Sequence, residues 1–164
     1  MYNAVHTAFV RLIRQAAWLG VLCTASLFAA GNNALTPVTF HSAGGAHIFQ
    51  VESAADETTR QRGLMYRETL APNGGMIFYF EPPRVATMWM KNTRISLDMI
   101  FVNSRARIVY IAGSATPGSL QYISAGVPVS AVIEIPGGSC DRLDIRVGDQ
   151  VDYERIISGS SEPQ

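Results

Sequence analysis

From about residue 38 onward, the hydrophobic positions of this chain repeat with the short period of β-strands. Between His47 and Glu52, apolar and polar side chains nearly alternate, which is the pattern of a half-buried strand. The segment 76–80 is instead a continuous apolar and aromatic run, closed by Pro82 and Pro83, and its length and composition favour a buried strand. Further strands are predicted at 38–41, 87–91, 97–102, 107–112, 130–135 and 151–157.

Helical patterns are short and few. The segment 56–65 lacks strand alternation and predicts a helix that is capped by Asp56 or Thr58 and broken at Gly63. A single helical turn is predicted at 139–143. Seven or eight short strands at about ten-residue spacing, with only short helices, are typical of a β-sandwich or barrel, so we predict a mainly β fold.

The N-terminus has the three-part pattern of a secretory signal peptide. Arg11 and Arg14 precede an apolar run at 16–30 that is too short for a comfortable membrane span, and small residues follow it. We expect cleavage near Gly31 and a periplasmic or secreted protein, with an uncleaved N-terminal anchor as the alternative. The expected organisation is a signal at 1–31, a lead-in at 32–37, a single β domain at 38–157 and a disordered tail at 158–164.

Removal of the signal changes the charge and the cysteine count. The loss of Arg11 and Arg14 leaves eleven basic against thirteen acidic residues, a formal charge of −2. This balance argues against a nucleic-acid partner, because such a partner would call for a basic patch. We also expect no membrane span in the mature form. Cys140 then has no partner for an intramolecular disulfide, and it is either a small buried residue or a reactive thiol. The sequence leaves the oligomeric state open.

The segment 87–93 holds the chain's single lysine, although twelve of the thirteen basic residues are arginine. In an extended chain Trp89 and Lys91 share one face, while Met88 and Met90 share the other. We expect the methionines to fill the core. The alternative, a soft-metal site for copper(I) at Met88 and Met90, lacks a nearby Cys or His pattern, so we expect no metal and no cofactor.

Asp98 interrupts the apolar run 97–102. A buried carboxylate needs a charged partner or hydrogen-bond donors. Lys91 and Arg67 are the candidate partners, either within a site or as a lock that holds two strands in register. Arg67 precedes a Gly/Pro-rich loop and also suits bidentate binding of a carboxylate or phosphate.

Other polar candidates surround these groups. Asn92 and Thr93 add an amide and a hydroxyl next to Lys91. Glu134 lies in the β-branched run 131–135, where it is either a second inward carboxylate or an outward residue of an alternating strand; we favour outward. Acid/base chemistry of the glycosidase type would need two such carboxylates close together.

Several motifs occur together in a recognisable order along the chain. They are Gly63-Leu64-Met65-Tyr66-Arg67, Gly75-Met76-Ile77-Phe78, Trp89-Met90-Lys91-Asn92-Thr93, Leu97-Asp98, Val132-Ile133-Glu134 and Val147-Gly148-Asp149-Gln150-Val151. Over about residues 38–153 the chain resembles the domain of unknown function family 192 (DUF192). The resemblance implies a jelly-roll-like β-sandwich, often in exported bacterial or archaeal proteins, and implies no activity. It places six residues at characteristic positions: Arg67, Trp89, Lys91, Asn92, Thr93 and Asp98.

The function that these residues suggest is binding. We expect an exported accessory module of the cell envelope that holds a small polar or anionic ligand with Arg67, Trp89, Lys91, Asn92, Thr93 and Asp98. A first alternative is a hydrolase or lyase acting on envelope material, with Asp98 or Glu134 as acid/base and Lys91 as electrostatic stabiliser. A second is a structural or interaction protein with no pocket beside Trp89.

Overall fold

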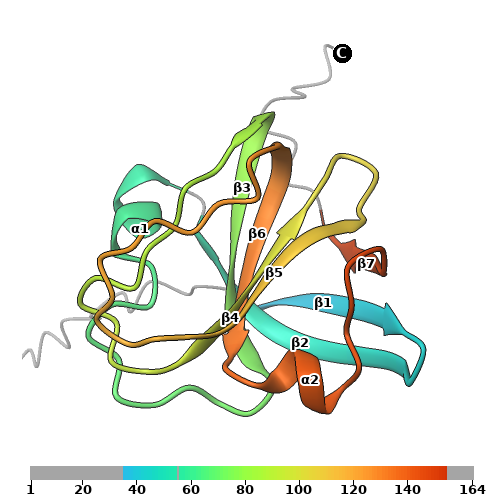
Figure 1. The fold of residues 1–164 in the computed structure, drawn as a ribbon, viewed down its shortest axis with the longest axis horizontal. Helices are drawn as coiled ribbons and strands as arrows, with labels where there is room; N and C mark the ends of the chain where they lie inside the picture. Colours follow the sequence, from blue (N-terminus) through green and yellow to red (C-terminus); the bar gives the residue numbers. More distant parts are fainter. Residues whose placement is uncertain (1–34, 55, 155–164) are drawn as a thin grey trace, which may run out of the picture. The chain divides into compact units, whose positions relative to one another are not determined.

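A computed structural model describes residues 35–54 and 56–154, which fall in one compact unit (Figure 1). The strands are β1 (Leu35–Ser42), β2 (Gly45–Ala54), β3 (Gly74–Val85), β4 (Leu97–Val102), β5 (Ile108–Ala115), β6 (Pro128–Pro136) and β7 (Gln150–Tyr153). Two short helices, α1 (Glu57–Arg62) and α2 (Ser139–Arg142), complete the described elements. The predicted signal peptide and the predicted tail lie outside the described residues, and part of the predicted lead-in belongs to β1.

The seven strands form one sheet in the order β5-β4-β6-β3-β2-β1-β7. The two ends of this order are joined, because Ile108 N donates to the Asp149 carbonyl at 3.0 Å and Val151 N donates to the Ala106 carbonyl at 2.9 Å. The sheet is therefore curled and barrel-like, and the prediction of a mainly β sandwich or barrel is confirmed. No helix in the described part of the chain is long and apolar enough to cross a membrane.

Two hydrophobic clusters lie on opposite faces of the central strands. Successive strand residues point to opposite faces, so Ile133 belongs to the first cluster while its neighbour Val132 belongs to the second. The first cluster takes residues from all seven strands, among them Phe40 and Phe49, whose rings meet edge to face at 5.6 Å. The second cluster takes most of its strand residues from β3, β4 and β6, with Ala54 from β2, Ala115 from β5 and residues of the segments that cover the sheet. The central strands are consequently buried on both faces.

The crossover between β2 and β3 explains the position of α1. These two strands pair in parallel, which requires a connection that returns along the sheet. Asp56 caps α1 by accepting a hydrogen bond from Thr59 N at 2.7 Å, and Gly63 ends it with a φ of 49°. The predicted helix is therefore confirmed, with its end at Arg62.

The predicted strand at 87–91 is wrong. This segment is extended but forms only an isolated bridge, between Met88 and Ile123, because its neighbour is a loop and not another strand.

Strand β3 runs beyond the predicted boundary at Pro82 and Pro83. Its register with β6 shifts between Tyr79 and Arg84, which accommodates two residues that are poor members of a regular ladder. The predicted strands at 97–102 and 107–112 are present as the antiparallel pair β4 and β5, and the predicted helical turn at 139–143 is present as α2.

Candidate ligand-binding site

Three loops are joined by backbone hydrogen bonds beside the second hydrophobic cluster. Tyr66 N donates to the Asn92 carbonyl at 2.9 Å, and Met90 N donates to the Ser119 carbonyl at 3.1 Å. Met88 exchanges two bonds of 2.9 Å with Ile123. Segments from three distant parts of the sequence therefore form one rim along the sheet.

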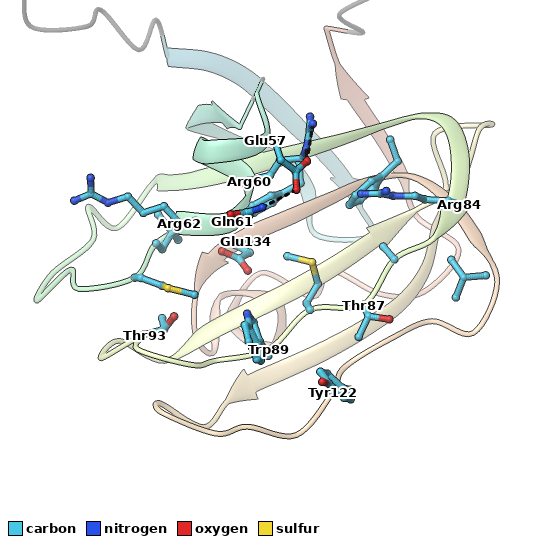
Figure 2. A pocket seen from close by; sticks show the side chains of 18 residues that line it. Glu57, Arg60, Gln61, Arg62, Arg84, Thr87, Trp89, Thr93, Tyr122 and Glu134 are labelled. Atoms are coloured by element: carbon cyan, nitrogen blue, oxygen red, sulfur yellow. Dashed lines mark hydrogen bonds and ion pairs between the residues drawn. The ribbon is translucent and has the colours of Figure 1, made fainter.

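A pocket of about 880 Å³ lies between this rim, α1 and the sheet (Figure 2). Its volume is within the range of small-molecule sites. Polar and charged side chains from α1 line one side and apolar side chains line the walls. The lining residues are Glu57, Arg60, Gln61, Arg62, Gly63, Leu64, Met65, Phe78, Phe80, Arg84, Val85, Ala86, Thr87, Met88, Trp89, Thr93, Tyr122 and Glu134.

Glu134 on β6 is the most deeply buried charged group that lines the pocket. Only 4% of the residue is exposed, and its partners across the ladder are Met76 on β3 and Met99 on β4. Its side chain has no hydrogen-bond or ion-pair partner among the described residues. Burial raises the pKa of Glu134 to about 8, because removal of water disfavours the charged form. At neutral pH the pocket therefore contains a predominantly protonated carboxylic acid.

Trp89 and Tyr122 form an aromatic pair on the opposite side of the pocket. Their rings are stacked with centroids 6.3 Å apart, and 38% of Trp89 is exposed against 75% of Tyr122. Figure 2 shows the indole nitrogen of Trp89 directed toward the side where Glu134 lies. Lys91 Nζ lies 4.9 Å from the centroid of the Trp89 ring. The indole N–H and the Glu134 carboxyl are thus two hydrogen-bonding groups that a bound molecule can meet.

Charged side chains of α1 and β3 form the mouth. Glu57 accepts hydrogen bonds from Arg60 at 3.1 Å and from Gln61 at 3.1 Å, and these bonds lower the pKa of Glu57. The guanidinium of Arg84 lies 4.7 Å from the centroid of the Phe80 ring. The guanidinium of Arg62 points away from Glu134 (Figure 2). Basic groups outnumber acidic ones at this entrance.

The sequence and fold of the whole domain agree with those of known proteins. The family model of DUF192, described as "Uncharacterized ACR", matches residues 38–153. The chain belongs to the DUF192 family. Among proteins with curated descriptions, none matches it.

Two solved structures resemble this DUF192 domain closely. One is a protein of unknown function from Novosphingobium aromaticivorans DSM 12444, with 43% identity and a TM-score of 0.70 over 71% of this chain and 84% of that one. The other, from Sinorhizobium meliloti 1021, is described as a "putative transcription regulator" and has 39% identity and a TM-score of 0.71 over 74% of this chain and 95% of that one. These likenesses establish the family and the fold.

The DUF192 motif residues divide into those that line the pocket and those that support it. Of the six predicted ligand-binding residues, Trp89 and Thr93 line the pocket. Arg67 instead forms a bidentate pair with Glu52, with the second bond at 2.7 Å, and this pairing raises the pKa of Arg67. Asn92 has a φ of 57° and donates from Nδ2 to the Tyr66 hydroxyl at 2.9 Å. Lys91 is exposed and lies over the Trp89 ring, and it does not line the pocket.

The predicted partnership of Asp98 with Lys91 or Arg67 is wrong. Asp98 is fully buried and accepts hydrogen bonds from three backbone amides: Ser114 N at 2.7 Å, Gly138 N at 2.9 Å and Cys140 N at 2.7 Å. These donors satisfy a buried carboxylate without a cation. The adjacent Cys140 thiol has a raised pKa, first because of burial and then because of the negative charge of Asp98. Asp98 is not part of the pocket lining, so its expected ligand contact stays a prediction without support.

The predicted alternation of residues 88–91 is confirmed. Met90 is fully buried and Met88 packs against the second cluster, while Trp89 and Lys91 are exposed on the other side. Met88 also lines the pocket, but Met90 does not. In the described ranges no group of three or more His, Cys, Asp or Glu side chains is placed to hold a metal ion.

We expected Glu134 to point outward into solvent, and that expectation is wrong, because the residue is buried. Glu134 does point away from the first cluster, opposite to Ile133 and Ile135, but this face of β6 is covered by the second cluster and not by solvent. The sequence also gave no indication that α1 and Tyr122 would face Glu134. The length of the loop 113–126 was the only available signal for Tyr122.

The pocket also bears on the two alternative functions. A cavity does lie beside Trp89, which contradicts a structural protein with no pocket. Glu134 lines the pocket, whereas Asp98 and Lys91 do not, so the proposed acid/base set is not assembled there. The geometry offers one neutral carboxylic acid, one indole N–H and an apolar wall, which is an arrangement suited to holding a molecule.

Proposed function

We propose that the protein binds a small organic molecule in the pocket between α1, Trp89 and Glu134. The observation that carries this proposal is the Glu134 carboxyl group, which is buried, faces the pocket and has no partner among the described residues. Burying a polar group without a hydrogen bond is unfavourable. Such groups concentrate at functional sites, where a ligand supplies the missing partner.

The walls of the pocket define the shape of the molecule. Leu64, Phe78, Phe80 and Met88 offer an apolar surface beside Glu134. The Trp89 and Tyr122 rings extend this surface to the exposed edge. A ligand with an apolar ring or chain and one hydrogen-bonding group at its inner end therefore complements the site, as in small sites that combine apolar walls with few polar groups.

We propose further that binding takes place outside the cytoplasm, in an accessory module of the cell envelope. The support is the N-terminal pattern of Arg11, Arg14 and the apolar run 16–30. Mass spectrometry of the protein recovered from a bacterial periplasmic fraction measures the processed N-terminus. Recovery of the full-length chain in the cytoplasm alone would contradict export.

The binding function is tested by ligand-observed NMR of the full chain against a fragment library of mixed charge. We expect ring-bearing fragments to bind the wild type, and Tyr122→Ala to weaken them about fivefold through the loss of aromatic contact. Leu120→Ala is the matched control, because Leu120 is exposed in the same loop and does not line the pocket. If no fragment binds, or if Tyr122→Ala and Trp89→Ala both leave every hit unchanged, the proposal is wrong.

A further inference from the structure

Building on this binding function, we propose that the ligand is an anion, a carboxylate or similar oxyanion carried on an apolar ring or chain. Its apolar body would lie against Leu64, Phe78 and Met88, and the hydrogen-bonding group at its inner end would meet Glu134. Its charged group would lie at the mouth beside Arg60 and Arg84. Three features of the pocket support this choice of charge and orientation.

The first feature is the charge of the mouth. Arg60 and Arg62 on α1 and Arg84 on β3 line the pocket, and Glu57 is the acidic residue among them. Glu57 is already bonded to Arg60 and also feels the positive charge of Arg84, which contributes to its lowered pKa. The guanidinium groups of this lining outnumber its exposed carboxylate, so the mouth is positively charged. It attracts oxyanions, which guanidinium groups bind with well-oriented hydrogen bonds.

The second feature is that the chain's own cations occupy aromatic faces around the site. Arg84 lies over Phe80 at 4.7 Å, and Lys91 lies over Trp89 at 4.9 Å. A cationic ligand would seek these faces, since cations are attracted to the faces of aromatic rings. At either ring it would instead meet a charge of the same sign, that of Arg84 or that of Lys91. The pocket therefore selects against ammonium ligands.

The third feature is the neutral interior. Glu134 is protonated at neutral pH because burial raises its pKa to about 8. Its neighbours across the ladder, Met76 on β3 and Met99 on β4, carry no charge. The charged groups of the pocket lining come from α1 and β3, at the mouth, and none of them contributes to the shift of Glu134. At neutral pH and below, a bound anion thus meets a hydrogen-bond donor inside and a carboxyl group that is mostly uncharged.

The charge preference is tested with three probes of matched shape, each with a hydroxyl group at the far end of the ring: 3-(4-hydroxyphenyl)propionate, 3-(4-hydroxyphenyl)propionamide and 3-(4-hydroxyphenyl)propylamine. Dissociation constants are measured by NMR titration of the full chain at pH 6.5. We expect the carboxylate to bind at least tenfold more tightly than the amide, and the amine to bind most weakly. Arg84→Gln should weaken the carboxylate about fivefold. Arg105→Gln, which removes the same charge from the exposed turn between β4 and β5, should change it less than twofold.

A pH series separates the role of Glu134 from that of the mouth. Between pH 6 and pH 9 the carboxylate should lose about tenfold in affinity for the wild type, because Glu134 ionises. Glu134→Gln should remove this pH dependence and keep the charge preference.

Equal binding of the three probes, or tighter binding of the amide or the amine, would overturn the anion preference. If the carboxylate probe does not bind but other library fragments still bind in a Tyr122-dependent way, the anion inference fails and the binding function stands. If no probe and no fragment binds, both fail.

Discussion

At the scale of single residues, Glu134 shows how a ligand site and a stable fold oppose each other. Its carboxyl group lies on the face of β6 that packs into the second cluster, between Met76 and Met99. No described residue compensates for the water that it loses. A glutamine, which is isosteric but never charged, would fit the same position at less cost. A glutamate there is therefore better explained by what it binds than by what it packs against.

This reasoning predicts a pH-dependent gain in stability for Glu134→Gln. The pKa of Glu134 is about 8 in the folded protein, against 4.5 for a free glutamate side chain. Between these values the folded state holds one more proton than the unfolded state, so stability falls as pH rises. Below pH 4.5 both states are protonated and the cost is absent, and above pH 8 it is complete.

We expect Glu134→Gln to be more stable than the wild type by roughly 3 kcal/mol at pH 7 and to differ by less than about 1 kcal/mol at pH 4.5. Urea unfolding of the full chain at a series of pH values measures the difference. Glu81→Gln is the control, because Glu81 is exposed on the same sheet. Parallel pH profiles for wild type and Glu134→Gln would show that Glu134 is not held as a buried neutral acid.

Sequence reasoning predicted residue orientation well where one neighbour on the chain decides it. The alternation of Met88, Trp89, Met90 and Lys91 required only an extended backbone. It failed for Asp98 because the partners are backbone amides, which every residue carries and no sequence pattern marks. It failed for Glu134 because orientation toward one face does not say whether that face is covered.

At the scale of elements, the strands were predictable and the pocket was not. Apolar runs and turn residues located β3, β4 and β6, and an Asp followed by a short polar segment located α1. The pocket arises where α1, the 87–93 segment and the 118–123 loop meet. These contacts join segments far apart in the sequence, and the extended segment 87–91 has the pattern of a strand without a strand partner.

The packing of β3 between β2 and β6 gives a prediction at Gly75. A Cβ atom at this position would lie 2.3 Å from the Glu134 carbonyl oxygen and 3.0 Å from Val51 Cγ1. Both strands beside it would have to move, so we expect Gly75→Ala to lower the unfolding free energy by about 2 kcal/mol. It should also weaken ligand binding, because β6 carries Glu134.

Gly113→Ala is the matched control for this substitution. Its new Cβ would meet only Asp98 Oδ1, at 3.9 Å, which is an ordinary contact. Chemical unfolding and probe titration of both variants provide the comparison. If Gly75→Ala is as stable as Gly113→Ala, the close approach of β3 and β6 is not a constraint on the fold.

At the scale of the whole domain, Asp98 joins parts of the sheet that the strand ladder alone does not hold. It sits in β4, and its three donors belong to the end of β5 and to the turn and helix that follow β6. Oδ1 accepts from Ser114 N and Gly138 N, and Oδ2 accepts from Cys140 N. One side chain thereby fixes where β5 ends and where α2 begins.

Asp98→Asn tests this role, because an asparagine keeps the shape but replaces one acceptor with an NH₂ group. Oδ1 can still accept two amides, whereas the new donor would face the N–H of Cys140 and leave it unsatisfied. We expect a loss of about 3 kcal/mol in unfolding free energy, from one charged hydrogen bond and one buried donor. Asp141→Asn is the control, since Asp141 is exposed and its pair with Arg146 lies on the surface.

The same variant also separates a structural from a ligand-binding role for Asp98. Asp98 is not part of the pocket lining, so Asp98→Asn should bind 3-(4-hydroxyphenyl)propionate within threefold of the wild type at a temperature where both are folded. A large loss of binding with little loss of stability would show that Asp98 takes part in ligand binding. The opposite result, lower stability with retained binding, would show that a DUF192 motif residue acts by holding the sheet ends together while Glu134 and Trp89 face the ligand.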